Sequence, residues 1–408
     1  SIGFDFNMHI RAFSDRAIKF QAWAGRLSNS HAVPNRWDIT FCVLLTIIAT
    51  AIFFIAKSWS VPVLSNVVAF DGKYYLDVAK HGYHFSGLIQ ERQNISYFPL
   101  ESLAIALSRW LLPGQNDFLK IALLGSATLL GTLSGFFFLL GEREGKQAAR
   151  LSALLWTFSP LAFYHFVGYA EPLFALGTVW CLVALRRGWL GTASVIAGIS
   201  MLGRPQAIVL VLFTAVEILR NAGWRPWRLA GIGTMLKLAM LAAPLMVFAS
   251  WMALAFHDSI IYVNAGAAWR HYYNSAGNFL PFFQSIGFFM HGISAESSVL
   301  TDWKVMLGCT SMVIAAMTIM LSTAASRREV LMYFAFFAFF ALVVSFDLSN
   351  FSRHTLYLAP WAIICGTALA NLPGREWRKW VALVPFVAFC VLINVYAVMR
   401  FYRWEWVS

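Results

Sequence analysis

The sequence predicts an all-α, polytopic membrane protein with about eleven transmembrane helices. Of its 408 residues, 59% are hydrophobic and only 12% are charged, and the mean hydropathy is +0.65. Several apolar runs reach the roughly 18 residues or more that indicate a membrane span. Helices are expected there, because a helix satisfies its backbone hydrogen bonds internally in lipid. Basic residues fall between these runs and not in a separate soluble domain.

The candidate spans are each near the roughly 20 residues that a bilayer core requires. They cover residues 39–57, 118–140, 151–168, 172–186, 190–203, 206–220, 230–255, 304–322, 329–346, 355–371 and 380–400. Residues 1–38 are basic and amphipathic, so we expect a cytoplasmic segment that lies on the membrane surface. Residues 39–408 form the predicted transmembrane domain, in which no internal repeat is evident.

The density of basic residues alternates from one gap between spans to the next. The dense gaps include "GEREGKQAAR", "LRRGW", "RNAGWRPWR", "SRRE" and "GREWRKW", and the positive-inside rule places them in the cytoplasm with the N-terminus. The sparse gaps then face the exterior, which we expect to be the periplasmic side of a bacterial inner (plasma) membrane. Two of them, residues 58–117 and 256–303, are long loops with amphipathic helical patterns, and long ordered loops usually carry function.

Charge and cysteine placement exclude several classes of protein. The net charge of +12 follows the cytoplasmic gaps, so it indicates topology and not a nucleic-acid partner. The sequence has no Gly-rich nucleotide loop and no metal-ligand spacing, so we expect no cofactor and no metal site. All cysteines lie inside apolar runs, where we expect small hydrophobic core residues without disulfides: Cys42, Cys181, Cys309, Cys365 and Cys390.

The stretch "FDGKYYLDVAKHGY", residues 70–83, gathers ionisable groups in an otherwise apolar chain. Its pattern predicts a short amphipathic helix on an apolar surface. Asp71 is expected to be the N-cap, with its carboxylate accepting hydrogen bonds from the first free N–H groups. Gly82 fits the left-handed position after the last turn. Lys73 and Asp77 have the spacing of an i,i+4 ion pair.

Ionisable side chains also gather at membrane depth or at the exterior ends of the predicted spans. Such groups are costly in lipid, so a functional role is the default hypothesis for them. They are Asp71, Asp77, Glu101, Glu171, Arg204, Arg270, His271, Asp347, Arg353 and His354. In the predicted topology all of them fall on one side of the membrane.

Each of these groups has a structural alternative. Glu171 opens a predicted helix, where a carboxylate stabilises the N-terminal dipole, and Arg204 sits in a turn from which its side chain can snorkel. Glu101 is within reach of Arg109 and would then form an ion pair instead of contacting a substrate. The remaining candidates fit juxtamembrane polarity or an interfacial aromatic belt: Arg353, His354, Trp269, Tyr272 and Tyr273.

Acids and cations at one membrane face would suit the transfer of a sugar from a lipid phosphate. A carboxylate must take the proton of the acceptor hydroxyl. Cations or N–H groups must neutralise the charge on the departing phosphate. An apolar groove must hold the lipid tail. The sequence places the candidate carboxylates and the candidate cations on the same predicted side of the membrane.

Four segments occur in order along the chain: "FDGKYYLDVAKHGY…SYFPLESL", "SPLAFYHFVGYAEPLFALG", "LGRPQAIVL" and "SRHTLYLAPW". They resemble the motifs of the PIG-V-like mannosyltransferases, and the resemblance covers most of the chain. It implies a GT-C fold and a polyprenyl-phosphate sugar as donor. This sequence departs from the family pattern at Phe70, where the family has Trp, at Ala170, where it has Ser, and at Gln206 and Ala207.

The resemblance implies an inverting transferase that moves a hexose, with mannose as the expected sugar, to an exterior glycolipid, glycan or protein acceptor. Asp71 would be the catalytic base, and Arg353, His354 and Arg204 would bind the donor phosphate. Candidates for sugar and acceptor binding are Lys73, Tyr74, Asp77, His81, Glu101, Glu171, Trp269, Arg270 and His271. Membrane lipids are the other expected partners, and we expect a reaction that needs no metal.

Two other classes of protein fit the same composition. A transporter or lipid flippase would share the polytopic bundle, but it more often has Gly- or Pro-broken helices in matching halves and a site at the midplane. A non-catalytic assembly subunit would need no particular carboxylate in the first exterior loop. Incubation of the purified protein with a panel of radiolabelled polyprenyl-phosphate sugars separates both classes from a transferase.

Overall fold

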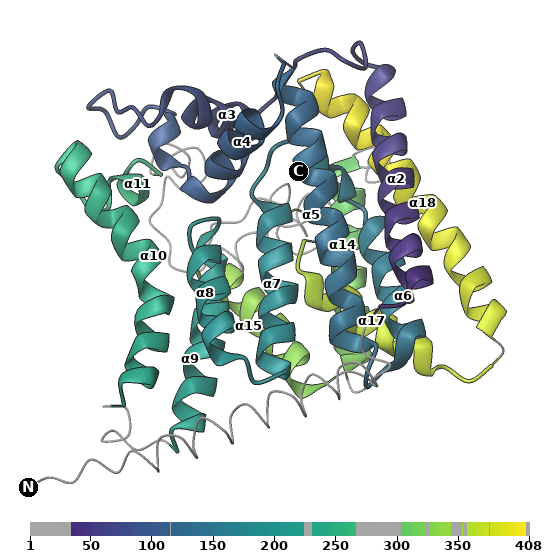
Figure 1. Ribbon diagram of the computed structural model, residues 1–408. Helices are drawn as coiled ribbons and strands as arrows, with labels where there is room; N and C mark the ends of the chain where they lie inside the picture. Colours follow the sequence, from purple (N-terminus) through teal and green to yellow (C-terminus); the bar gives the residue numbers. More distant parts are fainter. Residues whose placement is uncertain are drawn as a thin grey trace, which may run out of the picture.

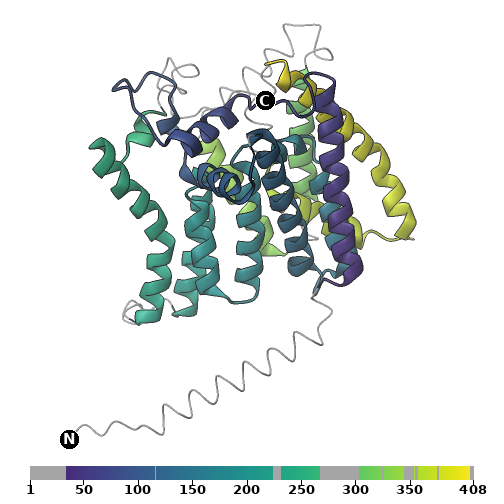
Figure 2. The ribbon, with the colours of Figure 1, turned by 45° about the horizontal axis from the view of Figure 1, so that its top comes forward.

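The computed structural model describes residues 34–114, 116–223, 231–266, 303–322, 326–343, 353, 357–374 and 376–404, and the regular structure within these ranges is all helical. Most helices run up and down in one bundle, while α3 (Asp71–His81) and α4 (Pro99–Leu111) lie across one end of it (Figure 1). The same arrangement is visible after rotation of the molecule (Figure 2). We call this end of the bundle the α3–α4 end.

A helix lies within or beside each of the predicted spans, so the all-α class is confirmed. The helices of the bundle are α2 (Arg36–Ser58), α5 (Asp117–Leu140), α6 (Gly145–Thr157), α7 (Glu171–Arg186), α8 (Leu190–Ser200), α9 (Ile208–Asn221), α10 (Ile232–Phe256), α14 (Trp303–Met320), α15 (Arg327–Val343), α17 (Ala359–Asn371) and α18 (Glu376–Tyr402). Short elements between them are η1 (Asn94–Ser96), η2 (Ala162–Phe166), η3 (Pro205–Ala207) and α11 (Ile261–Asn264).

The helices differ in whether they can cross a membrane by themselves. Four described helices are long and apolar enough to do so: Arg36–Ser58, Asp117–Leu140, Ile232–Phe256 and Lys379–Tyr402. The prediction of one continuous span over residues 151–168 is wrong, because α6 ends at Thr157 and η2 begins at Ala162. Pro160 explains the break, since a proline disfavours the helical conformation of the residue before it.

Local sequence signals begin and end several helices. Asn35 and Asp38 form a capping box at the start of α2, in which each side chain accepts a hydrogen bond from the other residue's N–H, at 2.9 and 3.1 Å. Asn116 caps α5 by accepting a hydrogen bond from the Leu119 N–H at 3.0 Å. Gly82 ends α3 with a positive φ of 80°, but its ψ of −174° lies outside the left-handed helical region, so the prediction of a left-handed cap is wrong.

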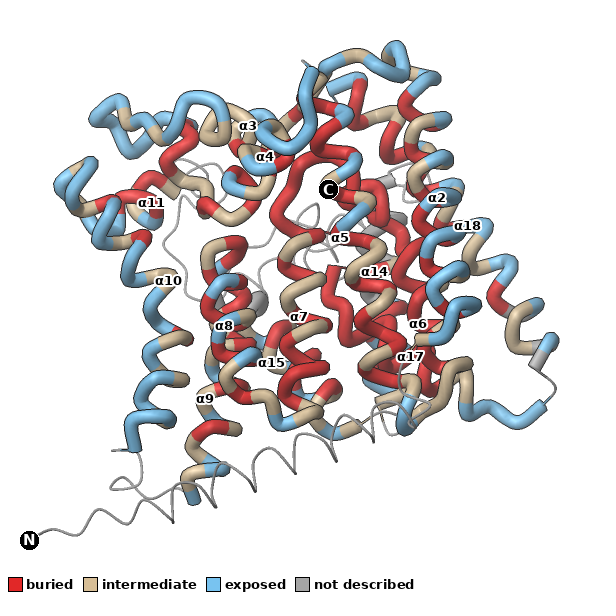
Figure 3. The backbone as a smooth tube through the Cα atoms, viewed as in Figure 1, coloured by how far each residue is buried: buried red, intermediate tan, exposed pale blue. Residues whose placement is uncertain are grey.

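Burial is concentrated around α5, α6, α7 and α17 (Figure 3). Helices α6 and α17 approach closely because Gly366 has no side chain, and a Cβ there would lie 2.2 Å from Ser152 Oγ. Helix α10 stands at the edge of the bundle, and its large apolar side chains Val247 and Leu254 are exposed, as expected of a surface that faces lipid. The described cysteines are buried free thiols, as predicted: Cys42, Cys181, Cys365 and Cys390.

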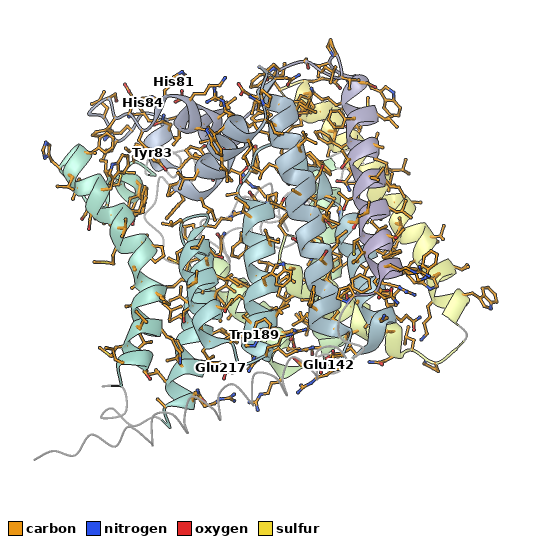
Figure 4. All side chains as sticks on the ribbon, viewed as in Figure 1. His81, Tyr83, His84, Glu142, Trp189 and Glu217 are labelled. Carbon is orange, nitrogen blue, oxygen red and sulfur yellow. The ribbon has the colours of Figure 1, made fainter. Side chains whose placement is uncertain are left out.

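The two ends of the bundle carry separate sets of polar side chains. At the end opposite α3 and α4, Arg150 pairs with Asp38 at 2.8 Å, and Arg186 pairs with Glu144 and Glu329, both at 3.0 Å. Figure 4 labels Glu142, Trp189 and Glu217 at this end, and His81, Tyr83 and His84 at the α3–α4 end. The described ion pairs therefore cluster at both ends of the bundle.

We predict that Lys73 and Arg187 lie on opposite sides of the membrane. Lys73 is exposed in α3, and Arg187 follows α7 at the other end of the bundle. In intact cells an impermeant thiol reagent should label Lys73→Cys, and it should label Arg187→Cys only after the membrane is opened. The dense basic gaps provide the physical reason, because they are retained in the cytoplasm. Labelling of both variants from the same side would contradict this topology.

Candidate active site

Four charged side chains from separate parts of the chain meet at the α3–α4 end. Asp71 is the first residue of α3, and Glu171 is the first residue of α7. Arg204 directly precedes η3 in the turn after α8, and Arg353 lies before α17. The fold thus brings together four of the residues that the sequence singled out. The predicted topology had placed all four on the same side of the membrane.

Arg353 joins the two carboxylates. Its Nη1 donates to Asp71 Oδ2 at 2.9 Å, and its Nε donates to Glu171 Oε1. The guanidinium also lies over two aromatic rings, 4.5 Å from the centroid of Tyr169 and 5.4 Å from that of Tyr164. Its side chain is only 9% exposed, so these contacts take the place of water around a buried cation.

Glu171 is shared by both arginines. Its Oε1 also accepts from Arg204 Nη1 at 2.6 Å, and its side chain is 1% exposed. Arg204 Nε donates in turn to Gln206 Oε1 at 3.1 Å. Glu171 Oε2 is buried and has no hydrogen-bond partner among the described residues. The simple helix-dipole role for Glu171 is therefore insufficient, because its carboxylate forms part of an alternating chain of charges.

Asp71 does not cap α3, so that expectation is wrong. Phe70 occupies the N-cap position, and no side chain makes a cap hydrogen bond there. The Asp71 carboxylate instead accepts from Arg353 and, through Oδ1, from the Tyr97 hydroxyl at 3.0 Å. Its backbone N–H donates to the Tyr169 hydroxyl at 3.4 Å. The carboxylate thus points away from its own helix and into the site.

Two tyrosines belong to this site that sequence reasoning did not select. Burial and the negative charge of Asp71 raise the pKa of Tyr97 well above its usual value, so its hydroxyl stays protonated and donates to the carboxylate. Tyr97 stacks on Tyr74 with ring centroids 5.0 Å apart, which brings the predicted Tyr74 next to the site. Tyr97 lies in the motif segment "SYFPLESL" and Tyr169 in "VGYAEPLFA". Their position inside these motifs was the sequence signal that could have identified them.

Glu101 is a buried acid beside the charged chain. Burial, reinforced by the negative charge of Glu171, raises its pKa well above the usual value. It does not pair with Arg109, so this structural alternative is wrong. Arg109 Nε donates to Asp117 Oδ1 at 2.9 Å, because Asp117 at the start of α5 faces α4. Glu101 therefore lies at the site as a buried carboxylic acid.

The remaining candidates of α3 lie on its exposed side. The predicted pair of Lys73 with Asp77 is replaced by an i,i+4 contact between His81 Nδ1 and Asp77 Oδ1 at 2.9 Å. Asp77 Oδ2 accepts from the buried Asn94 Nδ2 at 2.6 Å, which draws the carboxylate toward the next loop. Lys73 Nζ lies 4.9 Å from the centroid of the Tyr74 ring. Lys73 therefore approaches the chain of four charges only indirectly, through the rings of Tyr74 and Tyr97.

Several predicted residues lie outside the described ranges. They are Trp269, Arg270, His271, Tyr272, Tyr273, Asp347 and His354. Within the described ranges, no group of three or more His, Cys, Asp or Glu side chains is placed to hold a metal ion. Metal independence stays a prediction.

The bundle, with helices laid across one end above a charged site, has a membrane fold of the GT-C type, and the chain is an integral membrane protein. The chain is similar to the crystal structure of ArnT from Cupriavidus metallidurans bound to undecaprenyl phosphate, with a TM-score of 0.52 and 18% identity. The match covers 85% of this chain but only 63% of the ArnT chain. Neither a protein-family model nor a curated protein gives a significant match. The likeness therefore confirms the expected fold.

We predict that Glu101 makes stability depend on pH. Because its folded pKa is raised above the ordinary 4.5, the folded protein keeps a proton that the unfolded chain loses. The contribution of Glu101 to stability is then fully present below pH 4.5, and it is lost as the pH rises toward the folded pKa. Glu101→Gln should remove this fall, so the melting temperature of the variant in detergent, relative to that of the wild type, should increase as the pH rises above 4.5.

The matched control is Glu91→Gln, which changes an exposed carboxylate in the same connection between α3 and α4. This control should follow the wild-type dependence on pH. Parallel melting curves for Glu101→Gln and the wild type across the whole range would show that Glu101 is not held neutral by burial.

Proposed function

We propose that the chain is an inverting membrane glycosyltransferase that moves a hexose, with mannose as the expected sugar, from a polyprenyl-phosphate carrier to a glycolipid, glycan or protein acceptor. The observation that carries this proposal is the chain of ion pairs Asp71–Arg353–Glu171–Arg204 at one end of the bundle. Two further observations support the class of donor. ArnT shares the fold and was crystallised with undecaprenyl phosphate, and the sequence motifs resemble those of PIG-V-like mannosyltransferases.

In the proposed reaction Asp71 removes the proton from the acceptor hydroxyl. The acceptor oxygen then attacks C1 of the sugar, the bond between C1 and the phosphate oxygen breaks, and the phosphate leaves with the electron pair. A single displacement of this kind inverts the anomeric centre. Arg353 and Arg204 neutralise the charge that accumulates on the leaving phosphate.

The ion pair between Asp71 and Arg353 links binding of the donor to activation of the acceptor. A phosphate competes with carboxylates for a guanidinium, whose planar fork matches its oxygen atoms. When Arg353 Nη1 turns from Asp71 Oδ2 toward the phosphate, the adjacent cation no longer stabilises the carboxylate to the same degree. Asp71 Oδ2 is then free to accept a hydrogen bond from the acceptor hydroxyl. Donor binding thereby prepares the residue that activates the acceptor.

The position of the charges argues against transport. Substrate sites of secondary transporters lie near the midplane of the bilayer, between repeated halves. Here Asp71, Glu171 and Arg204 lie where α3 and α7 begin and where α8 is followed by η3, all at the α3–α4 end. A site at a membrane surface fits an acceptor that arrives from the aqueous side.

We predict that Asp71→Asn lowers the rate of transfer about 10²–10⁴-fold, because a general base contributes that much. The measurement is transfer of sugar from radiolabelled polyprenyl-phosphate mannose to a native lipid extract. Asp258→Asn is the matched control, since Asp258 is also a carboxylate at the α3–α4 end, where it accepts from the Ile260 N–H and from Asn264. Full activity of a folded Asp71→Asn variant would end the assignment of Asp71 as the base.

We predict that Arg353→Lys and Arg204→Lys weaken donor use, each raising the donor KM on the order of 10- to 100-fold. Lysine keeps the charge but loses the planar fork, and a charge-assisted hydrogen bond contributes about 1.5–3 kcal/mol. Arg220→Lys is the control, because Arg220 is 65% exposed and pairs with Glu217 at the opposite end. Unchanged donor saturation curves for both site variants would place the phosphate elsewhere.

A further inference from the structure

The residue before Asp71 has an unusual backbone conformation. Phe70 has φ of 50° and ψ of −128°, which is the conformation of the first central residue in a type II′ turn. Glycine adopts this region readily, but a bulky residue there is strained. Phe70 is the N-cap directly before Asp71, so its backbone conformation sets the direction in which the Asp71 side chain points. A strained residue persists only where its surroundings hold it.

The surroundings of Phe70 come from the far end of the chain. Its ring centroid lies 5.0 Å from that of Phe401, in the last turn of α18, and 5.6 Å from that of Trp404, just beyond this helix. Both pairs are tilted, at 56° and 53°, and both centroid distances lie within the range of roughly 4.5–7 Å that is typical of aromatic pairs. Phe401 is 2% exposed, so the end of α18 is packed firmly into the bundle.

The same end of α18 also reaches the other supports of Asp71. Phe401 contacts the ring of Tyr169, with centroids 6.1 Å apart, and Tyr169 accepts the hydrogen bond of the Asp71 N–H. On the other side of Asp71, a Cβ on Gly72 would lie 2.4 Å from the Val167 carbonyl oxygen. Residues 70–72 are thus held between the end of α18 and the segment that leads from η2 to α7.

We infer that the aromatic end of α18, formed by Phe401 and Trp404, positions Asp71 by holding Phe70 in its strained conformation. Without these rings, the backbone of Phe70 relaxes to a negative φ, and the start of α3 rotates. The Asp71 carboxylate then leaves the reach of Tyr97 and Arg353. Phe70, Phe401 and Trp404 are positioning residues that contact no reacting atom. The catalytic consequence rests on the proposed function, whereas the structural consequence does not.

The first experiment separates rate from binding. Trp404→Ala should lower kcat about 10- to 100-fold, because a displacement of about 1 Å at a reacting group costs that much. The donor KM should stay near the wild-type value, and Trp404→Phe should restore most of the rate. Trp377→Ala is the control, because Trp377 lies at the other end of α18 and both tryptophans are 56% exposed.

The second experiment needs no enzyme activity. Asp71→Asn weakens an ion pair with Arg353, so it should lower the melting temperature of the wild-type protein. In a Trp404→Ala background this pair is already loosened, and the same substitution should cost clearly less. In a Trp377→Ala background the two effects should add, as they do for independent sites.

These measurements distinguish failure of the inference from failure of the proposed function. If the wild-type protein transfers no sugar, the proposed function fails and the melting experiment alone tests the positioning. Additive effects of Trp404→Ala and Asp71→Asn overturn the inference, as does an unchanged kcat of Trp404→Ala in an active enzyme. If Trp404→Ala does not fold, Trp404→Leu, which keeps apolar volume without a ring, replaces it in both experiments.

Discussion

The structure of the α3–α4 end depends on one requirement, that buried charges be paired. Glu171 is 1% exposed and Arg353 is 9% exposed, so neither is stable there without the other. Asp71 and Arg204 extend the pair to a chain of four charges. Loss of a single partner leaves a buried charge uncompensated, which typically costs about 3–5 kcal/mol. This requirement holds together the starts of α3 and α7, the turn before η3 and the segment before α17.

Under the proposed function, the same pairing prepares the site for the phosphate of the donor. Arginines that are held by carboxylates and aromatic rings need little rearrangement when a phosphate arrives, and fixed charges stabilise a transition state better than mobile ones. Tyr169 takes part in both functions, because its ring faces Arg353 and its hydroxyl accepts from the Asp71 backbone. Structural support and proposed chemistry therefore depend on the same few side chains.

The fold class and the four charged residues that meet at the α3–α4 end were predictable, whereas the two tyrosines beside them and most of the pairings were not. Apolar runs and alternating basic density indicate helices and their direction, and direction alone places Asp71, Glu171 and Arg353 at one end. The contact of Asp71 with Arg353 joins residues that are distant in sequence, and spacing carries no signal for it. Local rules also failed where tertiary contacts competed with them. Asp71 is of a residue type that is typical of N-caps, but Phe70 occupies that position, and its ring packs against the end of α18.

The protonation of Glu101 has a consequence for the electrostatic potential of the whole site. The two guanidiniums and the carboxylates of Asp71 and Glu171 leave no net charge. An additional ionised carboxylate would make the local field negative and would repel an approaching anion. Burial and the charge of Glu171 raise the pKa of Glu101 and so oppose its ionisation, which under the proposed function favours the approach of a phosphate to this end of the bundle.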